Sequence, residues 1–450
     1  MAEKNRTLNM GKENIYEKNL GYSFLKTFWV DWKVKHSYRK TEVIGKENLP
    51  TDGAVIICPN HCNTLMDALV ILRSTPEKKV FGARADIFKK KFIANLMYFF
   101  RILPMVRRRD GIRNVLQNNE TQDIIVKVLA HGVPFILFPE GSHRTKHSLQ
   151  QLGKGAFRIA LAANEKFGSE KPVYLVPTGI EYGDYFRYRS TCLVNYGKPI
   201  NVTEFLKEGS FESDPQAIDA LRKLLAARIS DLITYIPDNE DYESIWALLK
   251  MCAIKGERKG YGDFGTDLYK SMLSNREIAA KIEALESEQP EKAAEIYQKA
   301  ADFEARRKKA GISIYSFRKC NPKANIIGKA FAALLGLPYF IFSSIVSLPM
   351  WALEKKIRGG IKDPAFGNTV SLGIKLVLHT ILSLIYIPLA FCLTKWWIAL
   401  ILIALWLPSF SYFHDYLEAC RRWISDIKLL KDKGLYKEFK SIVKEFNKSK

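Results

Sequence analysis

The sequence predicts an α/β domain in which helices flank a mixed sheet, followed by a helical insert and by hydrophobic membrane helices near the C-terminus. Between about 41 and 205, short apolar runs alternate with amphipathic stretches, which is the pattern of an α/β layer. Several of these runs end directly in polar or charged residues. Later in the chain, three long stretches contain no Asp, Glu, Lys or Arg, and each is close to the length that crosses a bilayer.

Length and charge limit the partners. A chain of 450 residues exceeds the size of one hydrophobic core, so we expect two or three structural units. The formal net charge of +22 favours an anionic partner, either nucleic acid or an anionic membrane. Because the chain also contains hydrophobic spans, we expect a lipid membrane as partner and no nucleic acid.

The chain divides into parts of different composition. The predicted domains are 1–40, an interfacial N-terminal helix; 41–205, the α/β domain; 206–325, a charged helical region; 326–413, membrane-embedded hydrophobic helices; and 414–450, a basic tail. Within the charged region, the clearest helical segments are 217–235 and 275–309. The predicted strands of the α/β domain are 41–44, 55–58, 79–83, 103–106, 134–138, 173–180 and 192–196.

A histidine and an aspartate follow the buried strand 54–58. His61 stands just after the strand and Asp67 six residues later, at the carboxyl edge where open α/β sheets usually bind their ligands. Six residues of ideal helix rotate by roughly 600°, so the two side chains cannot face each other within one regular helix. His61 is therefore expected to precede the helix and Asp67 to lie inside it. The alternative is a histidine that caps the helix and an aspartate that faces water.

Other strands also end in polar residues. The run 103–106 leads into Arg107, and the run 135–139 leads into Glu140, Gly141, Ser142, His143 and Arg144. A third run, 173–180, contains a Val-Pro pair. With the Asn60-His61 pair and Asp67, these blocks resemble the glycerolipid acyltransferase family, which includes glycerol-3-phosphate and 1-acylglycerol-3-phosphate acyltransferases of phospholipid biosynthesis. The resemblance covers about residues 41–200.

Two spacings depart from the commonest family pattern. Five residues separate His61 from Asp67 instead of four, and His143 stands between Ser142 and Arg144. Both variants are similar to the branch that includes yeast-type glycerol-3-phosphate acyltransferases. The departures concern the choice of substrate more than the presence of catalysis.

These residues carry the chemical groups that acyl transfer needs. Transfer from a thioester to an alcohol needs a general base for the hydroxyl and a cationic site for an acceptor phosphate. His61, oriented by Asp67, is the predicted base. Arg107 and Arg144 have planar guanidinium groups suited to a phosphate, with Lys154 nearby in sequence. We expect no metal and no cofactor, only acyl-CoA or acyl-carrier protein as co-substrate; Cys58 and Cys62 beside His61 lack a fourth zinc ligand.

The loop that contains Glu140 completes the predicted substrate site. The resemblance implies that Glu140, Gly141 and Ser142 contact the substrate, together with Arg144. Glu140 is expected to orient the arginines or to accept a hydrogen bond from the acceptor hydroxyl. The alternative is a salt bridge that holds the loop to the domain.

Several segments suit a membrane surface or interior. The segment 84–113 combines clustered Lys and Arg with Phe, Ile, Leu and Met, which is typical of a basic amphipathic helix on a bilayer. The runs 330–353, 376–394 and 396–413 carry no Asp, Glu, Lys or Arg. Because positive loops stay cytoplasmic, we expect 330–353 to be a re-entrant or in-plane element broken at Pro338 and Pro349. The other two runs then form a hairpin that turns near Lys395, and the catalytic domain lies on the cytoplasmic face.

The sequence thus predicts a membrane-bound O-acyltransferase. Its acceptor would be glycerol 3-phosphate or the 1-acyl form, lysophosphatidate. Two alternatives stay open: acylation of another lipid, such as an amino-acid lipid or a lysophospholipid, and a non-catalytic membrane scaffold. Scattered cysteines without a C-x-x-C pair indicate a reduced, cytoplasmic setting for the soluble part.

Overall fold

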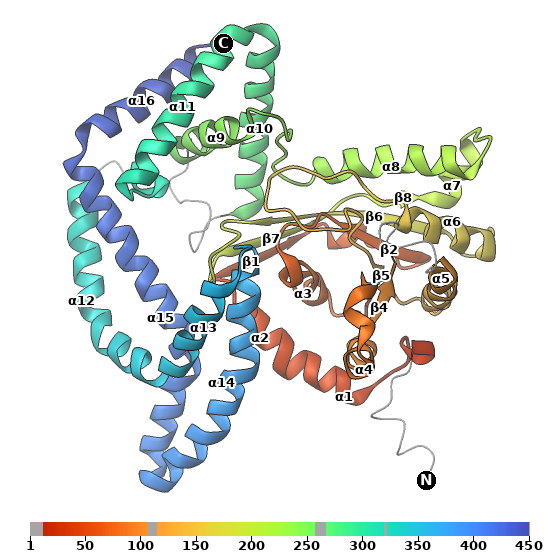
Figure 1. Ribbon diagram of the computed structural model, residues 1–450, viewed down its shortest axis with the longest axis horizontal. Coiled ribbons are helices and arrows are strands. Elements are labelled where there is room, and N and C mark those ends of the chain that lie inside the picture. The colour runs from red at the N-terminus through yellow and green to blue at the C-terminus, as the bar shows by residue number, and fades with distance from the viewer. Residues whose placement is uncertain (1–11, 107–114, 257–266, 319–321, 450) are drawn as a thin grey trace. The chain divides into compact units, whose positions relative to one another are not determined.

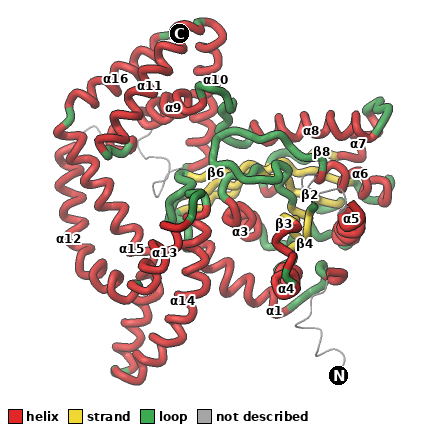
Figure 2. The backbone as a smooth tube through the Cα atoms, in the orientation of Figure 1, coloured by secondary structure: helices red, strands yellow, loops and turns green. Residues whose placement is uncertain are grey.

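This computed structural model describes residues 12–106, 115–256, 267–318 and 322–449. It contains two compact units, which we describe separately. The α/β unit comprises residues 1–35, 41–181 and 192–233, and the helical unit comprises 36–40, 182–191 and 234–450. Strands belong to the first of these, and the second is built almost entirely of helices (Figure 2). The α/β unit therefore extends to Ile233, beyond the sequence boundary at 205.

One eight-stranded mixed sheet forms the centre of the α/β unit. Its strands are β1 (Lys40–Ile44), β2 (Ala54–Pro59), β3 (Val80–Arg84), β4 (Ile102–Met105), β5 (Phe135–Ile136), β6 (Val173–Tyr182), β7 (Thr191–Tyr196) and β8 (Ile200–Asn201). Their order is β1-β7-β6-β2-β5-β3-β4, and β8 pairs with β6. All seven predicted strands are present, and the mixed α/β fold class is confirmed; the two-residue strand β8 was not predicted.

The middle of the sheet is parallel. Strand β2 pairs in parallel with β5 on one side and with β6 on the other, and β3 pairs in parallel with β4 and β5. Strand β8 runs antiparallel to β6. Because β2 and β5 are parallel neighbours, the segments that follow them emerge close to each other at one edge of the sheet. Every residue of β2 is buried, which explains its uninterrupted apolar sequence.

Helices cover both faces of this sheet. The α/β unit contains α1 (Leu20–Phe24), a π-helical turn η2 (Leu25–Asp31), α2 (Trp32–Lys35), α3 (Thr64–Ser74), α4 (Lys91–Phe99), α5 (Val115–Ala130), α6 (Gly155–Phe167), α7 (Val202–Glu208) and α8 (Asp214–Ser230), with short 3-10 turns η1 (Lys12–Asn14), η3 (Lys46–Asn48) and η4 (Ala85–Lys89). Helices α3 and α4 lie on one side of the sheet and α8 on the other (Figure 1). Helix α6 contacts β2, α5 and α8, and the fully buried Phe157 and Leu225 join it to the core.

The prediction of one amphipathic helix over 84–113 is wrong. Among the described residues of that range, only Lys91–Phe99 is an α-helix; η4 precedes it and strand β4 follows it. The strand forms because Leu103 and Pro104 pair in register with β3 and are buried. Arg107 and the residues to 114 lie outside the described residues. Apolar side chains are nevertheless exposed on α4, with Phe92 76% accessible.

The helical unit contains a bundle and a set of long apolar helices. Its elements are α9 (Tyr242–Gly256), α10 (Leu268–Glu288), α11 (Pro290–Ala310), η7 (Ile314–Arg318), α12 (Pro322–Val346), α13 (Leu348–Gly360), α14 (Phe366–Leu393), α15 (Trp396–Lys431) and α16 (Lys433–Lys448). The predicted single segment 275–309 is two helices, because the chain turns at Gln289 and Pro290 begins a new helix. Buried residues of α9, α10, α11 and α16 form one core.

Within the described part of the chain, three helices are long and apolar enough to cross a membrane. They are Ile326–Val346, Phe366–Leu393 and Trp396–Lys431. Only Thr394 and Lys395 separate the second from the third, where the sequence predicts a hairpin turn. Pro338 does not break the first helix, contrary to expectation; the interruption lies at Ser347, and Pro349 stands in the first turn of α13.

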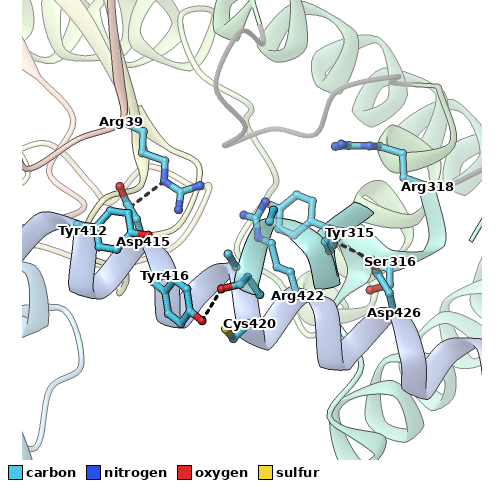
Figure 3. Close-up of a pocket in the computed structure, with 14 residues that line it drawn as sticks. Arg39, Tyr315, Ser316, Arg318, Tyr412, Asp415, Tyr416, Cys420, Arg422 and Asp426 are labelled. Atoms are coloured by element: carbon cyan, nitrogen blue, oxygen red, sulfur yellow. Dashed lines mark hydrogen bonds and ion pairs between the residues drawn. The ribbon is translucent and has the colours of Figure 1, made fainter. Parts of the chain in front are cut away.

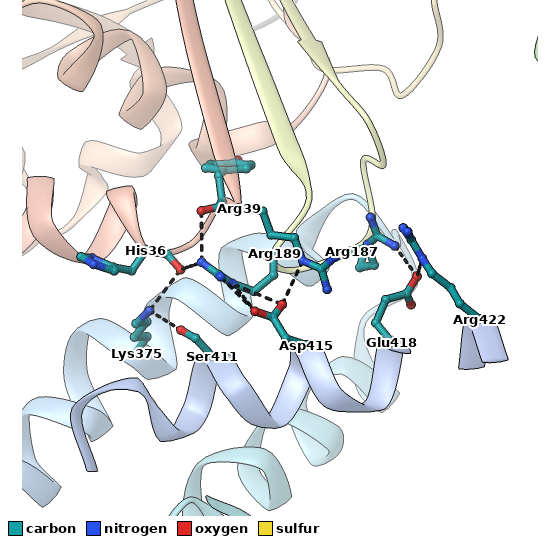
Figure 4. A network of polar contacts seen from close by, with 10 residues as sticks. His36, Arg39, Arg187, Arg189, Lys375, Ser411, Asp415, Glu418 and Arg422 are labelled. Carbon is teal, nitrogen blue, oxygen red and sulfur yellow. Dashed lines mark hydrogen bonds and ion pairs between the residues drawn. The ribbon is translucent and has the colours of Figure 1, made fainter. Parts of the chain in front are cut away.

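Partly buried ion pairs fasten two short segments to α15 inside the helical unit (Figure 4). Arg39 and Arg189 both donate to the carboxylate of Asp415, at 3.1 Å and 2.9 Å. Arg187 and Arg422 both donate to Glu418. The segments 36–40 and 182–191 are thereby part of the helical unit, although their neighbours in sequence belong to the α/β unit.

Replacing Asp415 by Asn tests this attachment. The variant leaves two largely buried guanidinium groups without their carboxylate, so we expect the free energy of unfolding to fall by about 1–3 kcal/mol. Each kcal/mol lowers Tm by roughly 2–4 °C in a domain of this size. Thermal unfolding of the purified protein in detergent measures the shift. Glu295→Gln, in an exposed pair with Lys299, is the matched control; equal Tm values for the two variants would contradict the attachment.

Candidate active site

His61 stands on a loop that is fixed to the sheet. The loop leaves β2 at Pro59, and the buried side chain of Asn60 pairs with the backbone of Ile180 in β6. The amide oxygen of Asn60 accepts from the Ile180 N–H at 2.6 Å, and its amide nitrogen donates to the Ile180 carbonyl at 3.1 Å. This two-point contact repeats the bonding of a strand, so it holds the start of the loop at a defined position.

Asp67 organises the rest of that loop. It lies in the first turn of α3, fully buried, and one carboxylate oxygen accepts three hydrogen bonds. The donors are Nδ1–H of His61 at 2.8 Å and the backbone N–H groups of Cys62 at 2.8 Å and Asn63 at 2.7 Å. His61 thus precedes the helix and Asp67 lies inside it, as the spacing of the two residues requires.

The backbone turns sharply at Thr64. Its φ angle is 47°, in the left-handed region that a β-branched residue rarely adopts. This residue begins α3, between the two backbone donors and Asp67. The unusual conformation allows a five-residue spacing between His61 and Asp67 to close on one carboxylate.

Glu140 connects this loop to the loop after β5. One of its oxygens accepts from the backbone N–H of His61 at 2.6 Å, and the other accepts from the backbone N–H of Gln150 at 2.9 Å. Burial raises the pKa of Glu140, and the two backbone donors oppose that rise. In this structure the carboxylate therefore holds the two loops together.

The glycine and serine after Glu140 shape the second loop. Gly141 has a φ angle of 67°, which favours glycine, and its N–H donates to the carbonyl of Phe138 in a tight turn. Gln150 closes the loop: its amide donates to the Ser142 carbonyl at 2.7 Å and accepts from the Ser142 hydroxyl at 3.2 Å. The sequence analysis did not single out Gln150, because it lies beyond the motif.

A backbone hydrogen bond joins Arg144 to His61. Its N–H donates to the His61 carbonyl at 3.0 Å, and its guanidinium donates to the Ser148 hydroxyl at 3.0 Å. The ring of His143 meets the His61 ring edge-on at 5.8 Å. The structure thus brings together His61, Asp67, Glu140 and Arg144 from the ends of two neighbouring strands.

The remaining predicted residues lie elsewhere or are not described. Lys154, at the start of α6, pairs with Asp219 of α8 at 3.8 Å. Arg107 lies outside the described residues. Two residues that the sequence analysis missed accompany the site: Phe138, whose ring centroid lies 4.5 Å from that of His61, and Asn63, which is fully buried and whose side-chain amide has no hydrogen-bond partner among the described residues.

The geometry defines what this site can do. With Nδ1 of His61 engaged by Asp67, the imidazole presents Nε2 to an incoming proton, and the ring stays 19% exposed. Cys62 does not offer an alternative nucleophile, because burial and the neighbouring carboxylate of Asp67 raise the pKa of its thiol well above the ordinary value. The site is therefore suited to general-base chemistry at His61.

The model of the Acyltransferase family matches residues 40–181 of this chain. The resemblance to glycerolipid acyltransferases is thereby confirmed. A relative from Saccharomyces cerevisiae, glycerol-3-phosphate O-acyltransferase 1, is 28% identical over 117 residues. That match covers 26% of this chain and only 15% of the yeast protein.

A solved structure is also similar. It is the 1-acyl-sn-glycerophosphate (LPA) acyltransferase PlsC from Thermotoga maritima, with 18% sequence identity and a TM-score of 0.33. The match covers 45% of this chain and 78% of that chain. At that TM-score we draw no argument from the superposition.

Replacing Glu140 by Gln tests the connection between the two loops. A Gln side chain has one acceptor and one donor, so one of the two backbone N–H groups loses its partner and the charge is lost. We expect the free energy of unfolding to fall by about 1–3 kcal/mol and the activity to fall with it, because His61 is displaced. Thermal unfolding and initial rates measure both, with exposed Glu165→Gln as control. An unchanged Tm would show that Glu140 does not hold the loops.

Proposed function

We propose that the protein is a membrane-bound O-acyltransferase that moves an acyl chain from acyl-CoA or acyl-carrier protein to a hydroxyl of glycerol 3-phosphate or 1-acylglycerol 3-phosphate. The observation that carries this proposal is the 2.8 Å contact between His61 and Asp67 at the carboxyl edge of a sheet in an Acyltransferase-family domain. The activity in the name of the yeast relative agrees with this substrate class.

The proposed reaction follows from the orientation of His61. Its Nε2 removes the proton from the acceptor hydroxyl, and the oxygen attacks the thioester carbonyl. The C–S bond then breaks as the ester forms, and the leaving thiolate takes the proton from the imidazolium. Asp67 fixes the ring and stabilises its positive charge during the transfer. No metal or further cofactor takes part in these steps.

The acceptor phosphate is assigned to arginine. The guanidinium of Arg144 follows the loop that Glu140 attaches to His61, so it lies on the same edge of the sheet as the base. A planar guanidinium suits a phosphate monoester. Arg107 follows strand β4 in sequence and is proposed as a second contact, as are Ser142, Gly141 and Lys154.

Membrane association has support from the surface of the α/β unit as well as from the three apolar helices. Leu20, Phe24, Phe28 and Trp32 recur every four residues along the N-terminal helix and are exposed. An apolar stripe with interspersed lysines suits an interfacial helix. Together with exposed Phe92 on α4, these side chains form a surface that a bilayer can cover.

Replacing His61 by Ala tests the base. We expect turnover to fall by roughly 10² to 10⁴ while the protein remains folded. Asp67→Asn should also lower turnover, because it misorients the ring. Rates with labelled acyl-CoA measure the effect, and His131→Ala, at the exposed end of α5, is the matched control. Turnover near that of the wild type in the purified His61→Ala variant would end this mechanism.

Replacing Arg144 by Ala tests whether this arginine binds the acceptor and not the acyl donor. The loss of one charge-assisted contact is expected to cost about 1.5–3 kcal/mol, or roughly ten- to a hundredfold in kcat/KM. The KM of the acceptor should rise, with little change for the acyl donor. Exposed Arg158→Ala in α6 is the control. A changed donor KM with an unchanged acceptor KM would contradict the assignment.

The proposed orientation places the catalytic domain, the basic segment before Gly360 and the C-terminal tail on the cytoplasmic face. Positive segments on that face follow the usual charge rule. Single cysteines at Gly360 and Lys440, in a cysteine-free background, should resist an impermeant maleimide in intact cells and react after lysis. Labelling of either position from outside would overturn the orientation.

A further inference from the structure

The helical unit contains a cleft that acyl transfer does not use. It lies between η7, α12 and α15, has a volume of about 460 Å³, and includes Arg39 at one end (Figure 3). Its charged lining residues are Arg39, Arg318, Lys329, Arg422, Asp415 and Asp426. Cations therefore outnumber carboxylates in the lining.

The excess of positive charge is larger than the lining alone shows. Asp415 forms ion pairs with both Arg39 and Arg189, and Glu418 with both Arg187 and Arg422. Four guanidinium groups therefore share two carboxylates. The six side chains are only 14% to 26% exposed. A largely buried excess of positive charge is best compensated by an anion.

The cleft lies where both helices change from apolar to charged sequence. In α12, Lys329 precedes the uncharged run that begins at Ala330; in α15, the uncharged run ends at Phe413 and Asp415 follows. Hydrogen bonds from α15 to α12 hold the two helices together where their sequences change. The hydroxyl of Tyr412 donates to the Gly336 carbonyl at 3.0 Å, and that of Tyr416 donates to the Ala333 carbonyl at 2.9 Å.

In a membrane, a change from apolar to charged sequence corresponds to the boundary between headgroups and acyl chains, where tyrosine is enriched. Small side chains also line the cleft, namely Ala332, Ala333 and Ala419. The guanidinium of Arg422 stacks on the ring of Tyr315 at 5.0 Å, which fixes its plane. The lining thus combines cationic groups with small apolar side chains.

We propose that this cleft binds one anionic glycerophospholipid. The phosphate lies against Arg39 and Arg422, where it compensates the guanidinium groups that share two carboxylates, and the acyl chains run along the small alanine side chains toward the apolar parts of α12 and α15. This binding is separate from substrate binding at His61. It adds a fixed lipid to the helical unit, which contains the segments 36–40 and 182–191.

Native mass spectrometry of the full chain in a nonionic detergent tests the proposal. The probe is dioleoylphosphatidylglycerol, an anionic diester that is neither acceptor nor product of the proposed reaction. We expect one molecule to be retained, with roughly tenfold preference over dioleoylphosphatidylcholine, and this preference should fall as salt is raised. Inorganic phosphate at millimolar concentration should not displace it, because it lacks the acyl chains.

Two variants locate the site. Arg422→Gln removes a lining charge, and its neighbour Arg421→Gln, on the exposed side of α15, is the matched control. Ala332→Phe fills the cleft and leaves every charge in place. Both cleft variants should weaken phosphatidylglycerol binding roughly tenfold, whereas Arg421→Gln and His61→Ala should bind like the wild type.

The outcomes are distinct. Equal binding by Arg422→Gln and Arg421→Gln would overturn the proposal, and so would wild-type binding by Ala332→Phe, which does not depend on the stability of the ion pairs. Displacement by inorganic phosphate would show a site for a free anion instead of a lipid. Loss of binding in His61→Ala alone would place the lipid in the active site. None of these results depends on which acceptor the enzyme acylates.

Discussion

One buried carboxylate determines the geometry of this site. Asp67 has no exposed surface, and a single oxygen accepts from the His61 ring and from two backbone N–H groups. A buried charge is stable only when such donors surround it. The same three bonds fix the loop and hold the ring of His61, next to the left-handed backbone at Thr64. The position of His61 therefore depends on the hydrogen bonds that Asp67 accepts.

Two neighbouring strands contribute their loops to one site. Since β2 and β5 are parallel and adjacent, the loops that follow them meet at the same edge. Glu140 accepts from the His61 N–H, and the Arg144 N–H donates to the His61 carbonyl, so both backbone groups of His61 are bonded to the second loop. The backbones of His61 and Arg144 are thus held at a defined separation, which the proposed transfer to a phosphorylated alcohol requires.

Much of this could be predicted from the sequence, because buried parallel strands are continuous apolar runs and their ends carry the polar residues. The rest depends on contacts that have no local pattern. Gln150 lies outside the motif, and Asp415 meets Arg39 across 376 positions of sequence. Helix 275–309 was predicted as one because its periodicity continues across Gln289. Pro338 was predicted to break a helix that in fact continues, which apolar helices tolerate when neighbouring groups satisfy the backbone.

The central claim is that the site transfers an acyl chain to a hydroxyl of a phosphorylated glycerol. The most direct measurement is to incubate the purified full chain with labelled acyl-CoA, or labelled acyl-carrier protein, and a panel of acceptors, and to identify the labelled products. The account predicts labelled lysophosphatidate from glycerol 3-phosphate or labelled phosphatidate from its 1-acyl form. Label found only in an ester of an acceptor without phosphate, or only in free fatty acid, would contradict it.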